Sequence, residues 1–438
     1  ELAAKIKDYL DILGSRDRIM AIISDELREV KSMFAVPRRT AIEESEFEAD
    51  IESLIQKEDM VISVTVGGYI KRVPLSSYRA QRRGGKGRSG MAMREEDAVN
   101  ELFIANTHTP VLFFSNTGKV YKMKVYRLPL GNAQARGKAL VNIFPLAEGE
   151  VITTFMPLPE DEATWDSCHI FFATAKGNVR RNDLSDFKSV MSNGKIAIKL
   201  EEGDKLVGVK SCVETDHVML TSREGKAMRF PIDAVRVFKS RTSDGVRGMK
   251  LAEGDEVVSI SILHGVKADA EQRDQYLKVA SARRRAAGEE EADDEAIDLT
   301  GITLTEEQIN EMAKEEEIIL TITENGYGKR TSAYAYRVTG RGGSGVTAMG
   351  LGKKNGKIIA SFPVEEGDQL MLMTDKATII RTDVKDIRLC GRSSQGVIVF
   401  RVEGEKVISA QRIKAAMLEG DADSEEPAAA DAAEATEE

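Results

Sequence analysis

A sixfold repetition of short β-type segments constrains the fold of this chain more than any other feature. Six stretches share a turn, a short run typical of a strand, and a basic residue. Turn pairs such as Gly67-Gly68 and Asn325-Gly326 suit tight hairpins, which require positive φ angles. The stretches are VTVGGYIKR (64–72), SNTGKVYK (115–122), TAKGNVRR (174–181), SREGKAMR (222–229), TENGYGKR (323–330) and TDKATIIR (374–381).

A single glycine, followed four residues later by an apolar position, recurs further along each unit. Because it recurs in every unit, we interpret its role as backbone geometry. One of the spacings between these glycines is doubled, and it contains a charge run and the helical pattern LTEEQINEMAKEEE, which predict an insertion at 264–317. The glycines are Gly87, Gly137, Gly194, Gly245, Gly345 and Gly396, spaced by 50, 57, 51, 100 and 51 residues.

Each unit of about 50 residues is too small to bury its own sheet face, yet it contains enough β segments for a four-stranded blade. Radial repetition solves this problem because it leaves only short edges unpaired. We therefore predict a mainly β fold, a propeller-like wheel of six blades over residues 61–413. An open solenoid is the alternative.

The N-terminal segment has a different period. Apolar residues alternate in steps of four and three from Leu2 to Phe34, and Arg16 alone interrupts this narrow stripe. Such a stripe is typical of a coiled-coil strand. We predict a long α-helical coiled-coil segment over residues 1–37, ended by Pro37, and a linker over residues 38–60. An amphipathic helix lying on the body is the alternative.

Charge is strongly segregated along the chain. The net charge is −10, but residues 1–60 contribute −6, residues 286–317 contribute −12, and residues 415–438 hold nine acids and no base. The remaining body, 61–285 with 318–414, therefore carries +17. A basic body of this kind indicates a polyanionic partner. We expect residues 414–438 to form an acidic disordered tail, which either only solvates the chain or competes with the polyanion for the body.

Several functional classes are disfavoured. The longest apolar runs are too short to span a membrane, and no secretory leader is visible. Three scattered cysteines without a CxxC pair fit a reducing cytoplasm, and four scattered histidines share no metal-ligand spacing. No phosphate-binding P-loop is present. We therefore expect no metal site and no cofactor in this chain.

The motif QRRGGKG at residues 81–87 is the densest basic cluster. Arginine and lysine neutralise phosphates, and glycines allow backbone N–H groups to approach them. No aromatic residue is interleaved, which disfavours base stacking on single strands. We therefore expect a surface for the backbone of duplex DNA, with a solvated basic loop as the alternative. The candidate residues are Gln81, Arg82, Arg83, Gly84, Gly85, Lys86 and Gly87.

The basic residue after each hairpin turn recurs once per unit, so on a wheel these residues are expected to charge the rim. The segment RGGSG (341–345) is the nearest copy of the QRRGGKG motif. The additional candidate DNA-binding residues are Arg72, Lys122, Arg181, Arg229, Arg330, Arg381 and Arg341.

QRRGGKG resembles the gyrase A box, the signature of the C-terminal DNA-wrapping domain of the DNA gyrase A family. The six repeats are similar to that family's six-bladed β-pinwheel. The segments DYLDILGSRDRIMAIISDELREVKSMF and RRTAIE resemble the end of its coiled-coil arm. The insertion at 264–317 and the tail do not map onto the family pattern.

The resemblance implies a bacterial, cytoplasmic component of a type IIA topoisomerase that wraps duplex DNA with positive handedness and thereby enables ATP-dependent negative supercoiling. It implies a gyrase A homodimer joined by two copies of gyrase B, which supplies the ATP and Mg sites. The family's catalytic tyrosine follows an arginine, and none of the nine tyrosines here does. No catalytic residue is therefore expected in this chain, and no DNA cleavage by it alone.

Two alternatives stay open. The C-terminal part of the corresponding topoisomerase IV protein resembles the same wheel, although an intact QRRGGKG disfavours it. A propeller scaffold that binds proteins is the other alternative, although such a scaffold does not need a body of charge +17.

Overall fold

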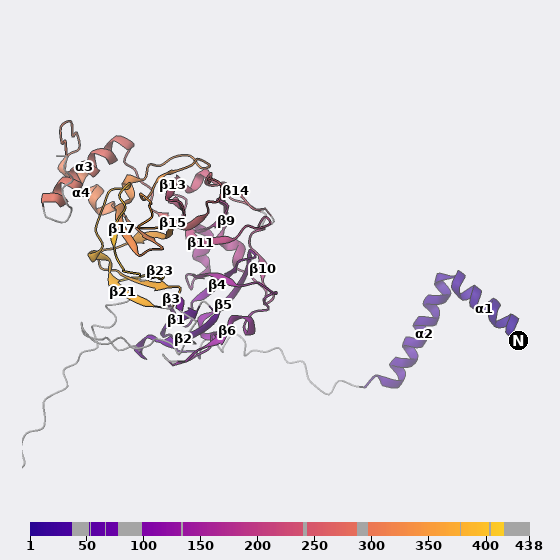
Figure 1. Cartoon of the computed structure of the whole chain (residues 1–438). Helices are drawn as coiled ribbons and strands as arrows, with labels where there is room; N and C mark the ends of the chain where they lie inside the picture. Colours follow the sequence, from indigo (N-terminus) through magenta and orange to yellow (C-terminus); the bar gives the residue numbers. More distant parts are fainter. Residues whose placement is uncertain are drawn as a thin grey trace, which may run out of the picture. The chain divides into compact units, whose positions relative to one another are not determined.

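The computed structural model describes residues 1–36, 52, 54–65, 67–77, 99–132, 135–239, 243–286, 297–376, 378–402 and 404–415. The chain divides into two compact units, Glu1–Leu54 and Ile55–Glu438. The described part of the first unit is mainly helical, and the second is built from antiparallel sheets (Figure 1).

The N-terminal segment forms two helices, α1 (Leu2–Gly14) and α2 (Arg16–Phe34). Ser15 separates them with extended backbone angles, φ −122° and ψ 109°, and its hydroxyl accepts a hydrogen bond from the Arg18 amide at 3.4 Å. A glycine immediately before a serine N-cap favours the end of one helix and the start of another. The helical character of the segment was predicted, but the expectation of one continuous helix ended by Pro37 is wrong.

The described residues of the second unit form six antiparallel sheets, which confirms the predicted mainly β, six-bladed class (Figure 1). The strands of the first three sheets, in spatial order, are β3 (Val99–Asn106), β1 (Asp59–Thr65), β2 (Tyr69–Pro74) and β6 (Lys138–Ala139); β10 (Lys195–Ile196), β5 (Lys119–Lys124), β4 (Pro110–Ser115) and β7 (Ile152–Pro157); β11 (Leu206–Cys212), β8 (His169–Thr174), β9 (Asn178–Asp183) and β14 (Val246–Arg247).

The strands of the other three sheets are β15 (Val257–Leu263), β12 (His217–Ser222), β13 (Lys226–Pro231) and β18 (Val346–Thr347); β19 (Ile358–Val364), β16 (Ile318–Thr323), β17 (Tyr327–Ser332) and β22 (Val397–Ile398); β21 (Ile379–Asp383), β20 (Gln369–Thr374) and β23 (Val407–Ile413). Short 3-10 helices are η1 (Leu75–Ser77), η2 (Val125–Arg127), η3 (Leu140–Asn142), η4 (Glu162–Ser167), η5 (Leu184–Phe187), η6 (Ile232–Ala234), η7 (Ala333–Ala335) and η8 (Val384–Asp386).

The fourth strand of each four-stranded sheet is a two-residue strand contributed by the next unit of the chain. Strand β14, for example, pairs with β9, and β18 pairs with β13. In the sixth sheet the described residues provide three strands, so β21 has no such partner among them.

The recurring glycine precedes each of these short strands, and its predicted backbone role is confirmed at the five described positions. Their φ angles range from 72° to 99°. A Cβ atom on Gly245 would lie 2.2 Å from the Val179 carbonyl oxygen, and one on Gly345 would lie 2.4 Å from that of Ala227. Glycine is therefore required both by the left-handed backbone and by close contact with the neighbouring strand. The equivalent Gly87 lies outside the described residues.

One strand of each sheet lies next to the corresponding strand of the neighbouring sheet. In the series β7, β11, β15, β19 and β23, each strand contacts the next one. Strand β23 also contacts β3 of the first sheet. These strands form the hub of the wheel. Since the two-residue strands lie at the opposite edge of their sheets, they belong to the outer edge.

The segment between β15 and β16 contains helices α3 (Ala270–Ala286) and α4 (Glu306–Glu315) (Figure 1). The Thr305 side chain and Gln308 form a capping box that starts α4. Buried Tyr276, Ile309 and Met312 pack with Tyr334 of η7. The insertion is thus attached to the fifth sheet through a small core of its own. No helix among the described residues is long and apolar enough to cross a membrane.

Candidate nucleic-acid interface

The QRRGGKG cluster, residues 81–87, lies outside the described residues, so its role stays a prediction. The nearest copy, RGGSG, is described. Arg341 in this copy is exposed, and its guanidinium donates to the carbonyl oxygens of Ala234 at 3.0 Å and Arg247 at 3.1 Å. Arg341 therefore bridges to the preceding unit while part of its side chain faces solvent.

Two of the arginines that follow the hairpin turns are buried. Arg229 is 1% exposed, and its guanidinium donates to Ala333 O at 2.8 Å, His264 O at 2.9 Å and His217 Nδ1 at 3.2 Å. Arg181 is 4% exposed. The expectation that these two arginines project from the rim is wrong, because the segment that crosses from the next unit covers them, at Val237 for Arg181 and at Val338 for Arg229.

The same arginine position holds neighbouring chain segments together. The Arg72 Nε atom donates to Leu128 O at 2.8 Å, and the Arg330 Nε atom donates to Ile387 O at 2.5 Å. Arg72, Arg181, Arg229 and Arg330 also form isolated parallel bridges with the segment that crosses from the next unit. A guanidinium has five donors in a fixed fork, which suits it to binding several carbonyl oxygens at once.

The two remaining basic residues after the hairpin turns, Lys122 and Arg381, differ from each other in exposure. The Lys122 ammonium is half-buried, 4.6 Å from the centre of the Trp165 ring, and it pairs with Glu162 at 2.5 Å. Arg381 is exposed, and its Nε atom donates to the Gln369 side chain. The hairpin bases are therefore mainly structural in this wheel, with Arg381 the most accessible of them.

Burial shifts the pKa values of two hydrogen-bonded side chains, His217 and Arg229. Burial, followed by the charge of Arg229, lowers the pKa of His217 to about 4. Burial also lowers the pKa of Arg229 to about 10, although the nearby Glu317 carboxylate opposes the shift. His217 is therefore neutral at pH 7, and its Nδ1 atom can accept the Arg229 hydrogen bond.

A second layer of buried cations supports the loops at the outer edge. Lys329 is fully buried, and its ammonium donates to the carbonyl oxygens of Gly391 at 2.9 Å and Ser394 at 3.2 Å. Burial lowers its pKa to about 7. Lys71 and Arg180 are also fully buried and donate to the carbonyls of Asn132 and Ser243. These buried basic side chains bind the backbone carbonyls of the glycine-containing loops.

Another basic position, which the pattern of hairpin turns and glycines did not reveal, recurs at the outer edge. In five units it lies at or shortly after the 3-10 helix that follows the second strand of the hairpin, and an apolar or aromatic residue precedes it. Phe187, Val235, Tyr336 and Ile387 in that preceding position are buried. The basic residues, here called the rim bases, are Arg127, Lys188, Arg236, Arg337 and Arg388.

The rim bases are accessible. Arg127, Arg236 and Arg337 are exposed, whereas Lys188 and Arg388 are half-buried. Lys188 pairs with Asp166 at 2.8 Å, and Arg236 lies 4.6 Å from the Phe238 ring. The detectable signal was the repeated pair of an apolar or aromatic residue and a base, as in Tyr336-Arg337 and Val235-Arg236.

This arrangement of exposed bases can bind a long polyanion. The described residues include no group of three side chains suited to a metal ion. Exposed guanidinium groups on a closed wheel can contact successive phosphates without reading bases. The positive charge of the body is thus placed, at least in part, on its circumference.

Comparison with known proteins decides the family. The DNA gyrase C-terminal domain, beta-propeller family matches six segments, 59–106, 109–159, 169–212, 216–264, 317–365 and 368–414. The chain belongs to the DNA gyrase A family. Each matched segment contains the three longer strands of one sheet, and the six segments leave out the residues between 264 and 317.

Two bacterial relatives agree. The DNA gyrase A protein of Rickettsia bellii is 55% identical over 427 residues, which are 97% of this chain and 47% of that protein. The gyrase A protein of Salmonella typhimurium is 38% identical over 401 residues, 91% of this chain and 40% of that protein. The chain thus spans about half the length of these gyrase relatives.

Solved structures support the fold. The structure of a DNA gyrase A C-terminal domain matches with a TM-score of 0.59 at 24% identity, over 81% of this chain and 99% of that one. The C-terminal domain of DNA topoisomerase IV has the same TM-score and identity, over 84% and 97%. The wheel is shared by both enzymes, whereas the sequence relatives above are gyrase A proteins.

Proposed function

We propose that this chain wraps duplex DNA around its β-wheel, with positive handedness, as part of a gyrase that introduces negative supercoils. The observation that carries the proposal is the recurrence of the rim bases around the outer edge of the wheel. Bending a site of 20–30 base pairs by 40–90° costs on the order of 1–6 kcal/mol, and distributed phosphate contacts can offset this cost.

In this proposal the chain determines the path of the DNA and does not carry out cleavage or ATP hydrolysis. A wrapped segment presents the neighbouring duplex for strand passage, and passage through a positive crossing leaves a negative one. Cleavage requires a tyrosine outside this chain, and ATP with Mg acts through gyrase B. The working enzyme in this proposal is a cytoplasmic assembly of two gyrase A and two gyrase B polypeptides.

The QRRGGKG cluster is proposed to anchor the wrap. Its three basic residues add positive charge to the first unit. The buried positions of Arg181 and Arg229 leave the wrapping contacts to this cluster, Arg341, Arg381 and the rim bases.

The test uses relaxed circular DNA, the purified chain and a nicking-closing enzyme. Positive wrapping should leave positively supercoiled circles after the protein is removed. Unchanged or negatively supercoiled circles would refute the proposal. A gel shift with linear duplex separates loss of wrapping from loss of binding.

A matched pair of variants tests the rim. Arg236→Ala removes an exposed charge from the outer edge, and Lys210→Ala removes an exposed charge from hub strand β11. Loss of one phosphate contact should reduce the slope of log K against log salt by about 0.9 for Arg236→Ala. Lys210→Ala should retain the parent slope, and equal slopes for the two variants would contradict the rim assignment.

A further inference from the structure

Two kinds of hydrogen bond recur between neighbouring sheets at the outer edge of the wheel. The first is formed by the arginine that stands four residues before the recurring glycine. Arg341 Nη1 donates to the carbonyl oxygen of Arg247 at 3.1 Å, and Arg392 Nη1 donates to that of Thr347 at 2.6 Å. The two acceptors are equivalent, because each lies two residues after the recurring glycine of the preceding unit. The same contact is therefore made in two successive pairs of units.

The second kind of bond joins the same units through the backbone. The Lys250 amide donates to Gly343 O at 2.8 Å, and the Gly350 amide donates to Ser394 O at 3.1 Å. Each donor lies five residues after one recurring glycine, and each acceptor lies two residues before the next one. The third sheet is thus bound to the fourth, and the fourth to the fifth, by the same pair of bonds.

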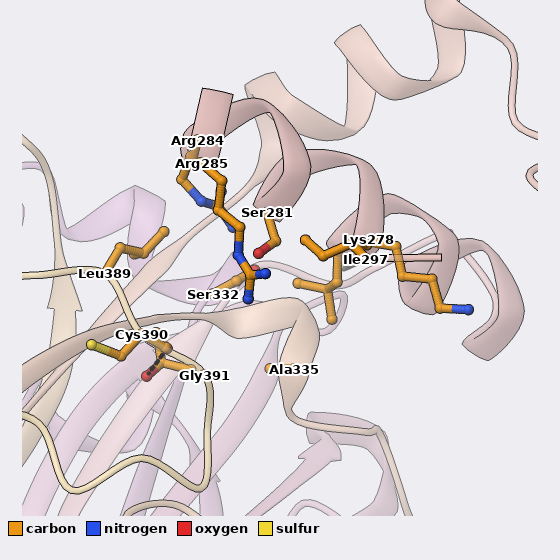
Figure 2. Close-up of a pocket in the computed structure, with 12 residues that line it drawn as sticks. Lys278, Ser281, Arg284, Arg285, Ile297, Ser332, Ala335, Leu389, Cys390 and Gly391 are labelled. Carbon is orange, nitrogen blue, oxygen red and sulfur yellow. Dashed lines mark hydrogen bonds between the residues drawn. The ribbon is translucent and has the colours of Figure 1, made fainter. Parts of the chain in front are cut away.

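The loop that carries Arg392 is also bound to its own sheet, the fifth. The Thr331 hydroxyl donates to the carbonyl oxygen of Cys390 at 3.1 Å, at the start of the loop (Figure 2). The Lys329 ammonium donates to Gly391 O at 2.9 Å. Arg392 therefore reaches the fourth sheet from a backbone that is held on the fifth.

These bonds lie at the edge of the sheets opposite the hub. Arg247 and Thr347 belong to the two-residue strands β14 and β18, whereas the same sheets meet at the hub through β11, β15 and β19. A tilt of one sheet relative to its neighbour pivots on the hub and moves the outer edges most. A bond at the outer edge therefore resists that tilt with the longest lever arm. Hydrogen bonds are also directional, whereas hydrophobic packing is not.

We propose that Arg341 and Arg392 are positioning residues, which fix the tilt between successive sheets and thereby set the path that wrapped DNA follows along the rim. A small tilt repeated at successive sheets displaces the rim bases along the axis of the wheel. A duplex that contacts these bases follows the displacement. The amount of writhe that the wheel traps therefore depends on the bonds between the sheets as well as on the charge of the rim. This inference rests on the proposed function.

The arginine is not present in every unit. The equivalent residue of the third unit is Val190, which is half-buried and has no side-chain hydrogen-bond donor. The equivalents in the first, second and fourth units, Arg83, Ala133 and Arg241, lie outside the described residues. The inference therefore concerns the third, fourth and fifth sheets, where both kinds of bond are formed.

The test compares Arg392→Lys with Arg223→Lys in the full chain. Lysine keeps the positive charge, but its side chain is one atom shorter and falls short of Thr347 O. Arg392→Lys should trap fewer positive supercoils per bound chain on relaxed circular DNA, while its duplex affinity and its slope of log K against log salt stay as in the parent. Arg223 pairs with Glu256 at 3.0 Å, next to hub strand β15, so Arg223→Lys should match the parent in all these measurements.

Combining Arg341→Lys with Arg392→Lys should deepen the loss. Arg341 contacts Ala234 O and Arg247 O through two different nitrogens, Nε and Nη1, and a single ammonium cannot replace both. Trapping by the double variant at the parent's level would overturn the inference. A fall in affinity that accounts for the whole loss of trapping would also overturn it, because the arginines would then act as DNA contacts alone. Failure of the parent chain to wrap DNA would instead refute the proposed function itself.

Discussion

Acidification tests the buried pair of His217 and Arg229. The pKa of His217 falls from 6.5 to about 4 on folding, chiefly through burial. Between these two values the unfolded chain binds the proton and the folded chain does not, so stability falls as the pH falls. The loss starts near pH 6.5, reaches about 2 kcal/mol at pH 5 and approaches about 3 kcal/mol below pH 4, at 1.36 kcal/mol for each pKa unit.

The variant His217→Gln isolates this effect. Its side-chain oxygen can still accept the Arg229 hydrogen bond but does not titrate. Urea unfolding of parent and variant at pH 7 and pH 5 should show their difference in unfolding free energy shifting by about 2 kcal/mol in favour of the variant. His264→Gln is the control, since His264 is 86% exposed at its side chain. A constant difference between parent and His217→Gln from pH 7 to pH 5 would refute the burial argument.

Three further results are expected. Alanine at the three basic residues of QRRGGKG should abolish positive supercoiling of relaxed circles while duplex binding persists in a gel shift; parent-like wrapping would reduce the cluster to a charge patch. Gly245→Ala should lower the unfolding free energy by more than about 1 kcal/mol, because its φ is 99° and the new Cβ would lie 2.2 Å from the Val179 carbonyl oxygen; an unchanged urea midpoint would contradict this. Deleting residues 416–438 should tighten duplex binding at low salt, with the gain fading as salt rises; identical affinity at both salts would mean that the tail does not compete.

The repeat positions could be predicted from sequence because the same backbone constraint fixes the residue type in every unit. A residue with φ near 80° that touches a neighbouring carbonyl must be glycine, so the glycines mark the same point in every unit. The insertion was visible for the same reason, as a doubled spacing.

The accessible charges could not be predicted in the same way. Arg181 and Arg229 recur as regularly as the rim bases, but recurrence does not distinguish an arginine that binds carbonyl oxygens from one at the surface. Burial depends on the segment that crosses from the next unit, at Val237 and Val338, which lies far away in sequence. The helix break at Ser15 was missed because an apolar stripe continues across it, while the local signal was a glycine followed by an N-cap serine.

Each unit contributes its short strand to the sheet of the preceding unit, and this has a consequence for how the number of blades can change. The stretch of chain that repeats is offset from the blade that it builds: β8, β9 and β11 belong to one sheet, whereas β10 completes the sheet before it. Excising one whole repeat would remove β10 from strand β5, but the next unit's β14 would arrive in its place. A gene segment that encodes one repeat can therefore be lost or duplicated while each remaining sheet keeps its short fourth strand. The number of sheets in the wheel can thus change by one at a time during evolution.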